Sequence, residues 1–430
     1  MRSKRFVVLL VIVAVVGVVV ALATWCFLEA IYQIQQELYT HLPHALGYDN
    51  APKWWPLPIL AIGALLAGLA ITRLPGNGGH VPADGLAVGG APRPVTLPGV
   101  LFAGMATIGF GLVLGPEAPL IALGGGVAVL MMSLNRRETP PQVLMVVAAA
   151  GTFSALSFIF ASPLIAAVIL IEASGIGGPM MRVVLVPGLL AAGIGTLVSI
   201  GMGSFTGLST SAYALGTLPL SPAARPTAVA FLWTIALAIA IALATSVLIR
   251  GGRLTHRFVL GHRFLLLLVV IALIIGGLAI AFTQITGHGS SQVLFDGQEA
   301  LPGLVAQAGT WSVAALAWLV VFKGLAYSLS LGAYRGGPTF PALFLGAAAG
   351  LMFSHLPGFS IDAGVAVGMG AAVVAVLRLP LSAVVIATLL TVHASDRVEP
   401  LIIVGVVVAY VLTLLVSARQ KSAPQAPSSA

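Results

Sequence analysis

One acidic side chain stands out in this chain of 430 residues because it interrupts a long apolar region. Glu117 lies in the sequence Gly-Pro-Glu-Ala-Pro that begins at Gly115, and uncharged runs cover 94–116 and 118–135 on its two sides. An ionisable group at membrane depth is costly and marks a functional site by default. Glu117 also stands at an expected helix start, where free N–H groups and the helix dipole attract an anion. We therefore expect its carboxylate to compete with a small anion for the same binding position at the helix start. In the simpler interpretation, the carboxylate only caps the helix.

The sequence around Glu117 occurs a second time. Ten residues from Gly115 and ten residues from Gly337 share the pattern G-P-x-x-P-x-x-x-L-G, with an offset of 222 residues. A second pair follows in the same order, since Pro163 begins PLIAAVILI and Pro380 begins PLSAVVIAT, with an offset of 217 residues. The agreement in order and spacing indicates a duplicated membrane unit rather than chance. Such repeats in transporters are usually inverted, with the site at their interface.

The repeated pattern suits an anion site made of helix starts. Proline favours the first turn of a helix, and a glycine before it lets the chain turn sharply. Two such helix N-termini that meet at mid-membrane would hold an anion through N–H groups, without a fixed positive charge. This matters because conduction requires binding weak enough for release.

Composition shows what kind of elements must position these motifs. Hydrophobic residues make up 59% of the chain and charged residues 7%, and the mean hydropathy is +1.08. About a quarter of the residues of a soluble domain are charged, so these values exclude a soluble globular protein, and disorder as well. The single cysteine, Cys26, excludes a disulfide-stapled fold. The net charge of +8 fits cytoplasmic loops rich in Lys and Arg and not nucleic-acid binding. We predict an all-α polytopic membrane protein.

The uncharged runs and basic clusters predict the topology. About 20 apolar residues span a bilayer, and the first run, 6–28, is too long for a signal peptide. Basic clusters near 136–137, 250–263 and 419–421 are expected on the cytoplasmic face of the cell membrane (inner or plasma), as are both termini. Several runs are short or broken by Gly and Pro, which is tolerated only inside protein or along a cavity.

The expected domain organisation follows from these runs. It is one transmembrane domain over 1–421, with repeats at about 55–205 and 225–418, and a disordered tail at 422–430.

In its motifs the sequence resembles the CLC family of chloride channels and chloride/proton antiporters. The family has three pore motifs, GSGIP, GREGP and GGxFxP. Residues 78–82 match the first loosely, 115–119 match the second, and 336–341 approximate the third. The helix starts at Pro163 and Pro380 fit the family's two A-P-L helices in the dimer interface region. The resemblance covers nearly the whole chain after residue 55.

The resemblance implies a fold, a function and roles for residues. The fold is a CLC-like pair of inverted-topology repeats of tilted, partly broken transmembrane helices. The function is passive or proton-coupled transport of chloride or a similar small anion across a lipid bilayer, by a homodimer. Glu117 is the implied gate and proton acceptor. The implied anion-binding residues are Gly79, His80, Gly115, Pro116, Ala118, Gly337, Pro338, Thr339 and Phe340.

Departures from the family motifs leave the substrate open. Gly79 replaces the motif serine, Thr339 aligns with the motif phenylalanine, and no aromatic residue follows Tyr410. We therefore expect a central anion site built differently, from backbone amides near Pro338 and the Thr339 hydroxyl. A preference for fluoride or nitrate is the alternative to chloride.

The inner proton-transfer glutamate of the antiporters aligns with Ala173, next to Glu172. We interpret Glu172 as a structural neighbour near a helix end, with a role as a substitute proton relay as the alternative. A channel or a loosely coupled exchanger is thus as well supported as an antiporter. His80 is interpreted as a solvated loop histidine or, alternatively, as a titratable group near the inner vestibule. Lys323 and Arg378 are interpreted as paired or snorkelling at helix ends, or as raising the vestibule potential for anions.

Two other classes of protein fit less well. A membrane-embedded enzyme would need a nucleophile with a base, or a metal cluster, and the sequence has no H-E-x-x-H or G-x-S-x-G motif and no metal-ligand spacing of its histidines. We expect neither a metal nor a cofactor. A cation-coupled carrier would need several intramembrane acids, whereas only Glu117 and Glu172 lie deep in apolar runs.

Overall fold

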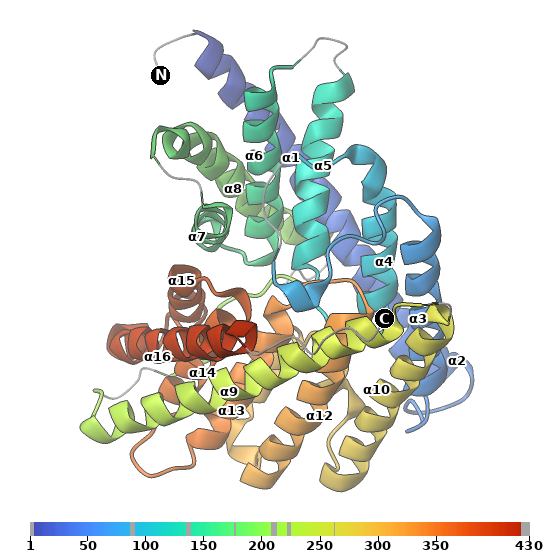
Figure 1. The fold of residues 1–430 in the computed structure, drawn as a ribbon, viewed down its shortest axis with the longest axis vertical. Helices are drawn as coiled ribbons and strands as arrows, with labels where there is room; N and C mark the ends of the chain where they lie inside the picture. Colours follow the sequence, from blue (N-terminus) through green and yellow to red (C-terminus); the bar gives the residue numbers. More distant parts are fainter. Residues whose placement is uncertain are drawn as a thin grey trace.

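The computed structural model describes residues 4–86, 91–134, 139–175, 178–207, 213–221, 225–261 and 263–422. These residues form a bundle of helices joined by turns and short extended segments (Figure 1). Within the described residues, nine helices are long and apolar enough to cross a membrane, as the hydropathy predicted. Five shorter apolar helices accompany them, and three of these begin in the repeated motifs, at Pro163, Thr339 and Pro380. The predicted disordered tail lies outside the described residues except for Ser422, which ends the last helix.

The helices of the first half are α1 (Lys4–Gln36), α2 (Leu42–Ala45), α3 (Pro56–Arg73), α4 (Leu97–Gly109), α5 (Glu117–Leu134), α6 (Pro141–Ile159), α7 (Pro163–Ser174) and α8 (Gly178–Thr206). The helices of the second half are α9 (Ala228–Val259), α10 (Phe264–Thr286), α11 (Ala300–Ala306), α12 (Val313–Ala333), α13 (Thr339–Phe353), α14 (Ile361–Leu377), α15 (Pro380–Leu390) and α16 (Ser395–Ser422). Short 3-10 or π-helical turns lie at Glu37–His41, Pro82–Asp84, Pro94–Thr96, Ser290–Gln292 and Ala308–Thr310.

The two halves repeat one set of helix contacts. Helix α1 packs on α6 and α8, just as α9 packs on α14 and α16; α5 packs on α6 as α13 packs on α14. Most of the first half lies in the upper part of Figure 1 and most of the second half below it, with α7 and α15 in contact between them. Because α1 has the contacts that α9 has in the second half, we propose that the first repeat includes α1, which precedes the boundary expected near residue 55.

The glycine that ends the repeated pattern lets helix backbones approach closely. A Cβ atom on Gly124 would lie 2.6 Å from the carbonyl oxygen of Gly151 in α6. A Cβ atom on Gly346 would lie 2.3 Å from the carbonyl oxygen of Gly368 in α14. Small residues at such contacts are the usual means of close helix packing in membranes. The same pattern therefore builds the same helix pair in each half.

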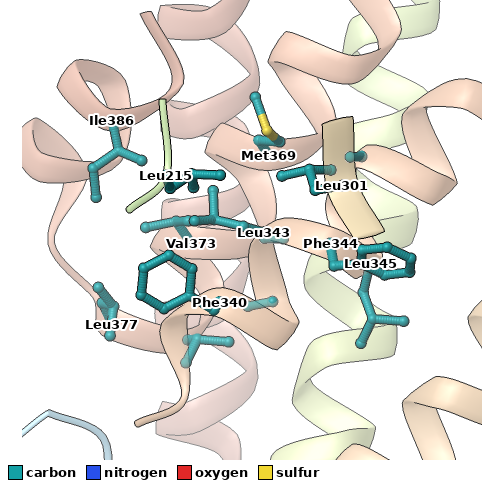
Figure 2. Packing of buried hydrophobic residues seen from close by; sticks show 14 of the residues in the cluster. Leu215, Leu301, Phe340, Leu343, Phe344, Leu345, Met369, Val373, Leu377 and Ile386 are labelled. Carbon is teal, nitrogen blue, oxygen red and sulfur yellow. The ribbon is translucent and has the colours of Figure 1, made fainter. Parts of the chain in front are cut away.

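Helix α13 lies inside the protein rather than against lipid. Its residues 339–351 are all buried, and a helix that is apolar all round is typical of a core position. Figure 2 shows Phe340, Leu343 and Phe344 of α13 among buried side chains that include Met369 and Val373 of α14. The N-terminus of α13 is thus held at a set place within the bundle, where its free N–H groups need a partner from the protein or from a ligand.

Candidate anion site between two helix starts

The two repeated motifs meet in space. The N–H of Gly115 donates to the carbonyl of Gly337 at 2.8 Å, and the N–H of Gly337 donates to the carbonyl of Gly115 at 2.5 Å. Helix α5 begins two residues after Gly115 at Glu117, and α13 begins two residues after Gly337 at Thr339. This antiparallel bridge therefore holds two helix N-termini side by side, although 222 residues separate them in the sequence.

The Glu117 carboxyl fills the space between these helix starts. The residue is 1% exposed, and its Oε1 accepts a hydrogen bond from the backbone N–H of Thr339, the first residue of α13. A Cβ atom on Gly337 would lie 1.9 Å from the Glu117 carboxyl carbon, and one on Gly115 would lie 2.2 Å from its Oε2. Only glycine fits at both positions. The carboxylate thus occupies the hydrogen-bonding position that a bound anion would take at α13.

Two cavities flank Glu117. The His80 cavity, about 380 Å³, is lined by Ala118 and Pro119 of α5 and by residues that include 78–80 and Gly336. The Asp296 cavity, about 340 Å³, is lined by Pro116 and by residues 291–292 and 295–300, together with α1 residues. The residues directly before and after Glu117 therefore line different cavities.

Most of the predicted anion-binding residues gather around this point. Gly115, Pro116 and Ala118 surround Glu117 in sequence, while Gly337 and Thr339 contact its carboxyl from the other repeat. The Pro338 carbonyl accepts a hydrogen bond from the Tyr327 hydroxyl at 2.7 Å, which fixes the turn into α13. The Phe340 ring stacks on the Phe160 ring, with centroids 5.3 Å apart.

The loop motif at 78–82 lies at the wall of the His80 cavity. Gly79 and His80 both line it, and His80 is exposed, so the structure is compatible with both interpretations of this histidine. The N–H of Gly79 donates to the Gly76 carbonyl at 2.8 Å. Gly79 therefore lines the cavity without a side chain, and its amide is already engaged in a turn.

Glu172 caps a helix of the other repeat. Its carboxylate accepts hydrogen bonds from the N–H groups of Leu381 at 2.9 Å and Ser382 at 2.7 Å, and from the Ser382 hydroxyl at 2.6 Å. These donors lie in the first turn of α15, whose free N–H groups attract an anion. Glu117 and Glu172 thus each place a carboxylate on a helix start of the second half. The contacts of Glu172 favour the structural interpretation over a proton relay.

Glu172→Ala is therefore expected to lower stability by about 1–2 kcal/mol, the usual cost of losing a helix cap. Thermal unfolding in detergent, with Asp49→Ala at an exposed position as the control, measures this loss. The pH dependence of anion flux in Glu172→Ala should match that of the unmodified protein. A changed pH profile at unchanged stability would instead support the relay.

Lys323 does not lie at a helix end as expected, whereas Arg378 does. Lys323 lies within α12, is fully buried, and donates to the carbonyls of residues 292–295 at 3.0 to 3.4 Å. Its Nζ also lies 4.5 Å from the centroid of the Phe344 ring. The 290–295 segment folds over α12 at this point, so the ammonium meets backbone carbonyls instead of water. Arg378 is the C-cap of α14 and donates to the Ser417 hydroxyl at 3.0 Å.

Sequence reasoning missed the acidic pair in the Asp296 cavity. Asp296 and Glu299 lie directly after an uncharged run that ends at Phe295, in a segment between α10 and α11. The available signal was an Asp-Gly step that interrupts the apolar pattern between two spans. In the part of the chain that the structure describes, no group of three or more His, Cys, Asp or Glu side chains could hold a metal ion.

A buried carboxylate between two opposed helix starts, within an inverted-repeat bundle of membrane helices, defines the class as a membrane transport protein. The family model described as "Voltage gated chloride channel" matches residues 63–414, so the chain belongs to this family, the CLC channels and antiporters. YfeO of Escherichia coli O1:K1 / APEC, which carries a provisional description as an ion-transport protein, is 28% identical over 371 residues. The match covers 83% of this chain and 81% of YfeO.

Solved structures share the fold. A slow cyanobacterial Cl−/H+ antiporter has a TM-score of 0.76 at 19% identity, over 95% of this chain and 94% of that chain. A CLC-type fluoride/proton antiporter has a TM-score of 0.65 at 17% identity, over 96% of this chain and 97% of that chain. At these identities the likeness shows the fold alone, and it agrees with the predicted all-α polytopic architecture.

Proposed function

We propose that this protein carries chloride or a similar small anion across the membrane through a pathway gated by Glu117. The observation that carries the proposal is the hydrogen bond from the α13 N-terminus to the Glu117 carboxyl, whose neighbours Pro116 and Ala118 line two different cavities. Ionised, the carboxylate holds the place of the anion. Protonated, it loses its attraction to the helix start and leaves the N–H groups to a permeating anion. Proton uptake by Glu117 and anion passage are coupled in this way.

A fluoride- or nitrate-preferring exchanger is the second candidate. It is favoured by the loop at 78–82, where Gly79 supplies no hydroxyl and its amide is engaged in a turn. A channel and an exchanger share the geometry at Glu117. Since Glu172 is taken up by a helix cap, an exchanger of this kind would need another inner route for protons.

The same family membership leads us to propose a homodimer with cytoplasmic termini. The starts of α7 and α15 carry exposed leucines, Leu164 at 51% and Leu381 at 58%, on helices that contact each other. Such an apolar face suits either lipid or a second copy of the chain.

Reconstitution into liposomes tests the function. We expect chloride efflux above that of empty liposomes, and its absence would contradict the proposal. The reversal potential under combined chloride and pH gradients then distinguishes a channel from an exchanger. A channel follows the chloride gradient alone, whereas an exchanger shifts with the pH gradient as well. Replacing chloride with fluoride or nitrate in the same assay ranks the anions.

A further inference from the structure

The Asp296 cavity has an unusual lining for an anion pathway. Two carboxylates, Asp296 and Glu299, line it, and none of its described lining residues is Lys, Arg or His. Negative charge on the walls of a cavity lowers the local anion concentration and raises that of protons. The cavity also reaches Pro116, next to Glu117, and Asp296 lies close enough to Glu117 for their charges to interact.

Polar side chains in the wall of the Asp296 cavity, Gln292 and Gln298 among them, make it a place where water can bind. Gln298 is 6% exposed, and its Nε2 has no hydrogen-bond partner among the described residues. The Oε1 of Gln292, in the same wall, is also buried without a partner. Buried polar atoms are normally hydrogen-bonded to protein or to ordered water. A cavity of this volume has room for water between Asp296 and the region of Glu117.

Asp296 is held in place and can exchange protons. Its Oδ1 accepts the N–H of Gln298 at 2.9 Å, and the preceding segment is fixed by the four carbonyl contacts of Lys323. Asp296 lies in the segment that joins α10 to α11, outside the membrane-spanning helices. Burial raises its pKa to about 6, although the Lys323 charge opposes this rise. It therefore holds a proton at mildly acidic pH, where an ordinary aspartate has lost it. The titratable groups around it are Lys323 of α12, Glu117 of α5, Glu299, Tyr32 of α1, Tyr39 and Tyr213.

We propose that Asp296 is the proton donor and acceptor for Glu117 on this side of the membrane, an inference that rests on the proposed function. The proton leaves the Asp296 carboxyl, passes through water in the cavity, and binds a carboxyl oxygen of Glu117. Glu117 becomes neutral and releases the α13 N-terminus, while Asp296 becomes a carboxylate. A proton from bulk solvent then enters the cavity beside Glu299, which is exposed there, and binds Asp296. The reverse sequence returns a proton to solvent.

The test is anion flux from liposomes at a series of symmetrical pH values, for Asp296→Asn, Glu117→Gln and the double variant. At neutral pH, Asp296→Asn is expected to reduce flux by at least about tenfold, which is less than the about 10²–10⁴-fold that a positioned acid–base group usually contributes. The difference in flux between Asp296→Asn and the unmodified protein should vanish at acid pH, where solvent protonates Glu117 directly. In the Glu117→Gln background, Asp296→Asn should change nothing. Glu37→Gln, at an exposed acid outside the cavity, is the matched control.

Two results would overturn the inference while leaving the proposed function intact. One is a wild-type pH profile in Asp296→Asn, and the other is an equal loss of flux in the Glu117→Gln background, since that loss would not act through Glu117. If Asp296→Asn is not recovered as a monodisperse protein, Asp296→Glu replaces it. If the midpoint of the flux–pH curve shifts in Asp296→Glu, the relay is supported. An unchanged midpoint of that curve overturns it. A wild-type protein without flux would overturn the function, and the inference with it.

Discussion

Glu117→Ala is expected to leave anion flux in place and to abolish its dependence on pH. In the unmodified protein, flux that requires a protonated Glu117 should fall by up to about tenfold for each pH unit above the midpoint, as for any single titrating group. Without the carboxyl, the space between Gly115, Gly337 and the Thr339 N–H is open at every pH. Chloride efflux from liposomes at a series of symmetrical pH values measures both the size of the flux and its dependence on pH.

Glu117→Gln provides the matched comparison for this prediction. It keeps the size of the side chain but removes the charge, so it should resemble a permanently protonated Glu117 and also lack a pH response. A pH response in Glu117→Ala equal to that of the unmodified protein would remove Glu117 from the gating role. Loss of all flux in a well-folded Glu117→Ala would show that the carboxyl is needed for passage itself.

Lys323→Met is expected to cause the largest loss of stability among the variants considered. The substitution leaves the carbonyls of residues 292–295 without their shared donor inside the protein. Each buried acceptor that loses its partner costs about 1–3 kcal/mol, so a total of at least about 3 kcal/mol is expected. Thermal unfolding in detergent, followed by the fraction of monodisperse protein, measures the change.

Leu325→Met, on the same helix but 47% exposed, is the control for Lys323→Met. An exposed substitution of this kind should change stability by less than about 0.5 kcal/mol. Equal unfolding temperatures for Lys323→Met and Leu325→Met would mean that water or another donor replaces the ammonium. The structure then would not depend on Lys323 to hold the segment that carries Asp296.

Local chemistry made the membrane helices and the acid at the site predictable. Hydropathy identifies spans because an apolar segment can cross lipid as a helix, which satisfies its backbone N–H and C=O groups within the segment. The Gly-Pro step before Glu117 signals a helix start because both residues act on their own backbone dihedrals. The same holds at Gly337, and so the repeat could be found by comparing the chain with itself. Glu117 was predictable for the further reason that a lone carboxylate in an apolar run has few structural uses.

Contacts across the chain could not be predicted in this way. No local pattern tells that Lys323 meets a ring of carbonyls 28 to 31 residues earlier rather than the membrane surface. The Asp296 cavity depends on how the segment after α10 folds back beside Pro116. Helix α1 packs against α6 and α8, a contact that the motif offsets alone did not reveal.

The sequence by itself determined that the chain lies in a membrane, that it is duplicated, and that Glu117 stands at a helix start, because each of these is a property of neighbouring residues. Only the tertiary structure decided that the Glu117 carboxyl binds the other repeat's helix start, that Glu172 caps α15, and that an acidic cavity lies beside Pro116. Such pairings join residues about 200 positions apart. They are set by the packing of the whole bundle, because no property of neighbouring residues specifies a partner so far along the chain.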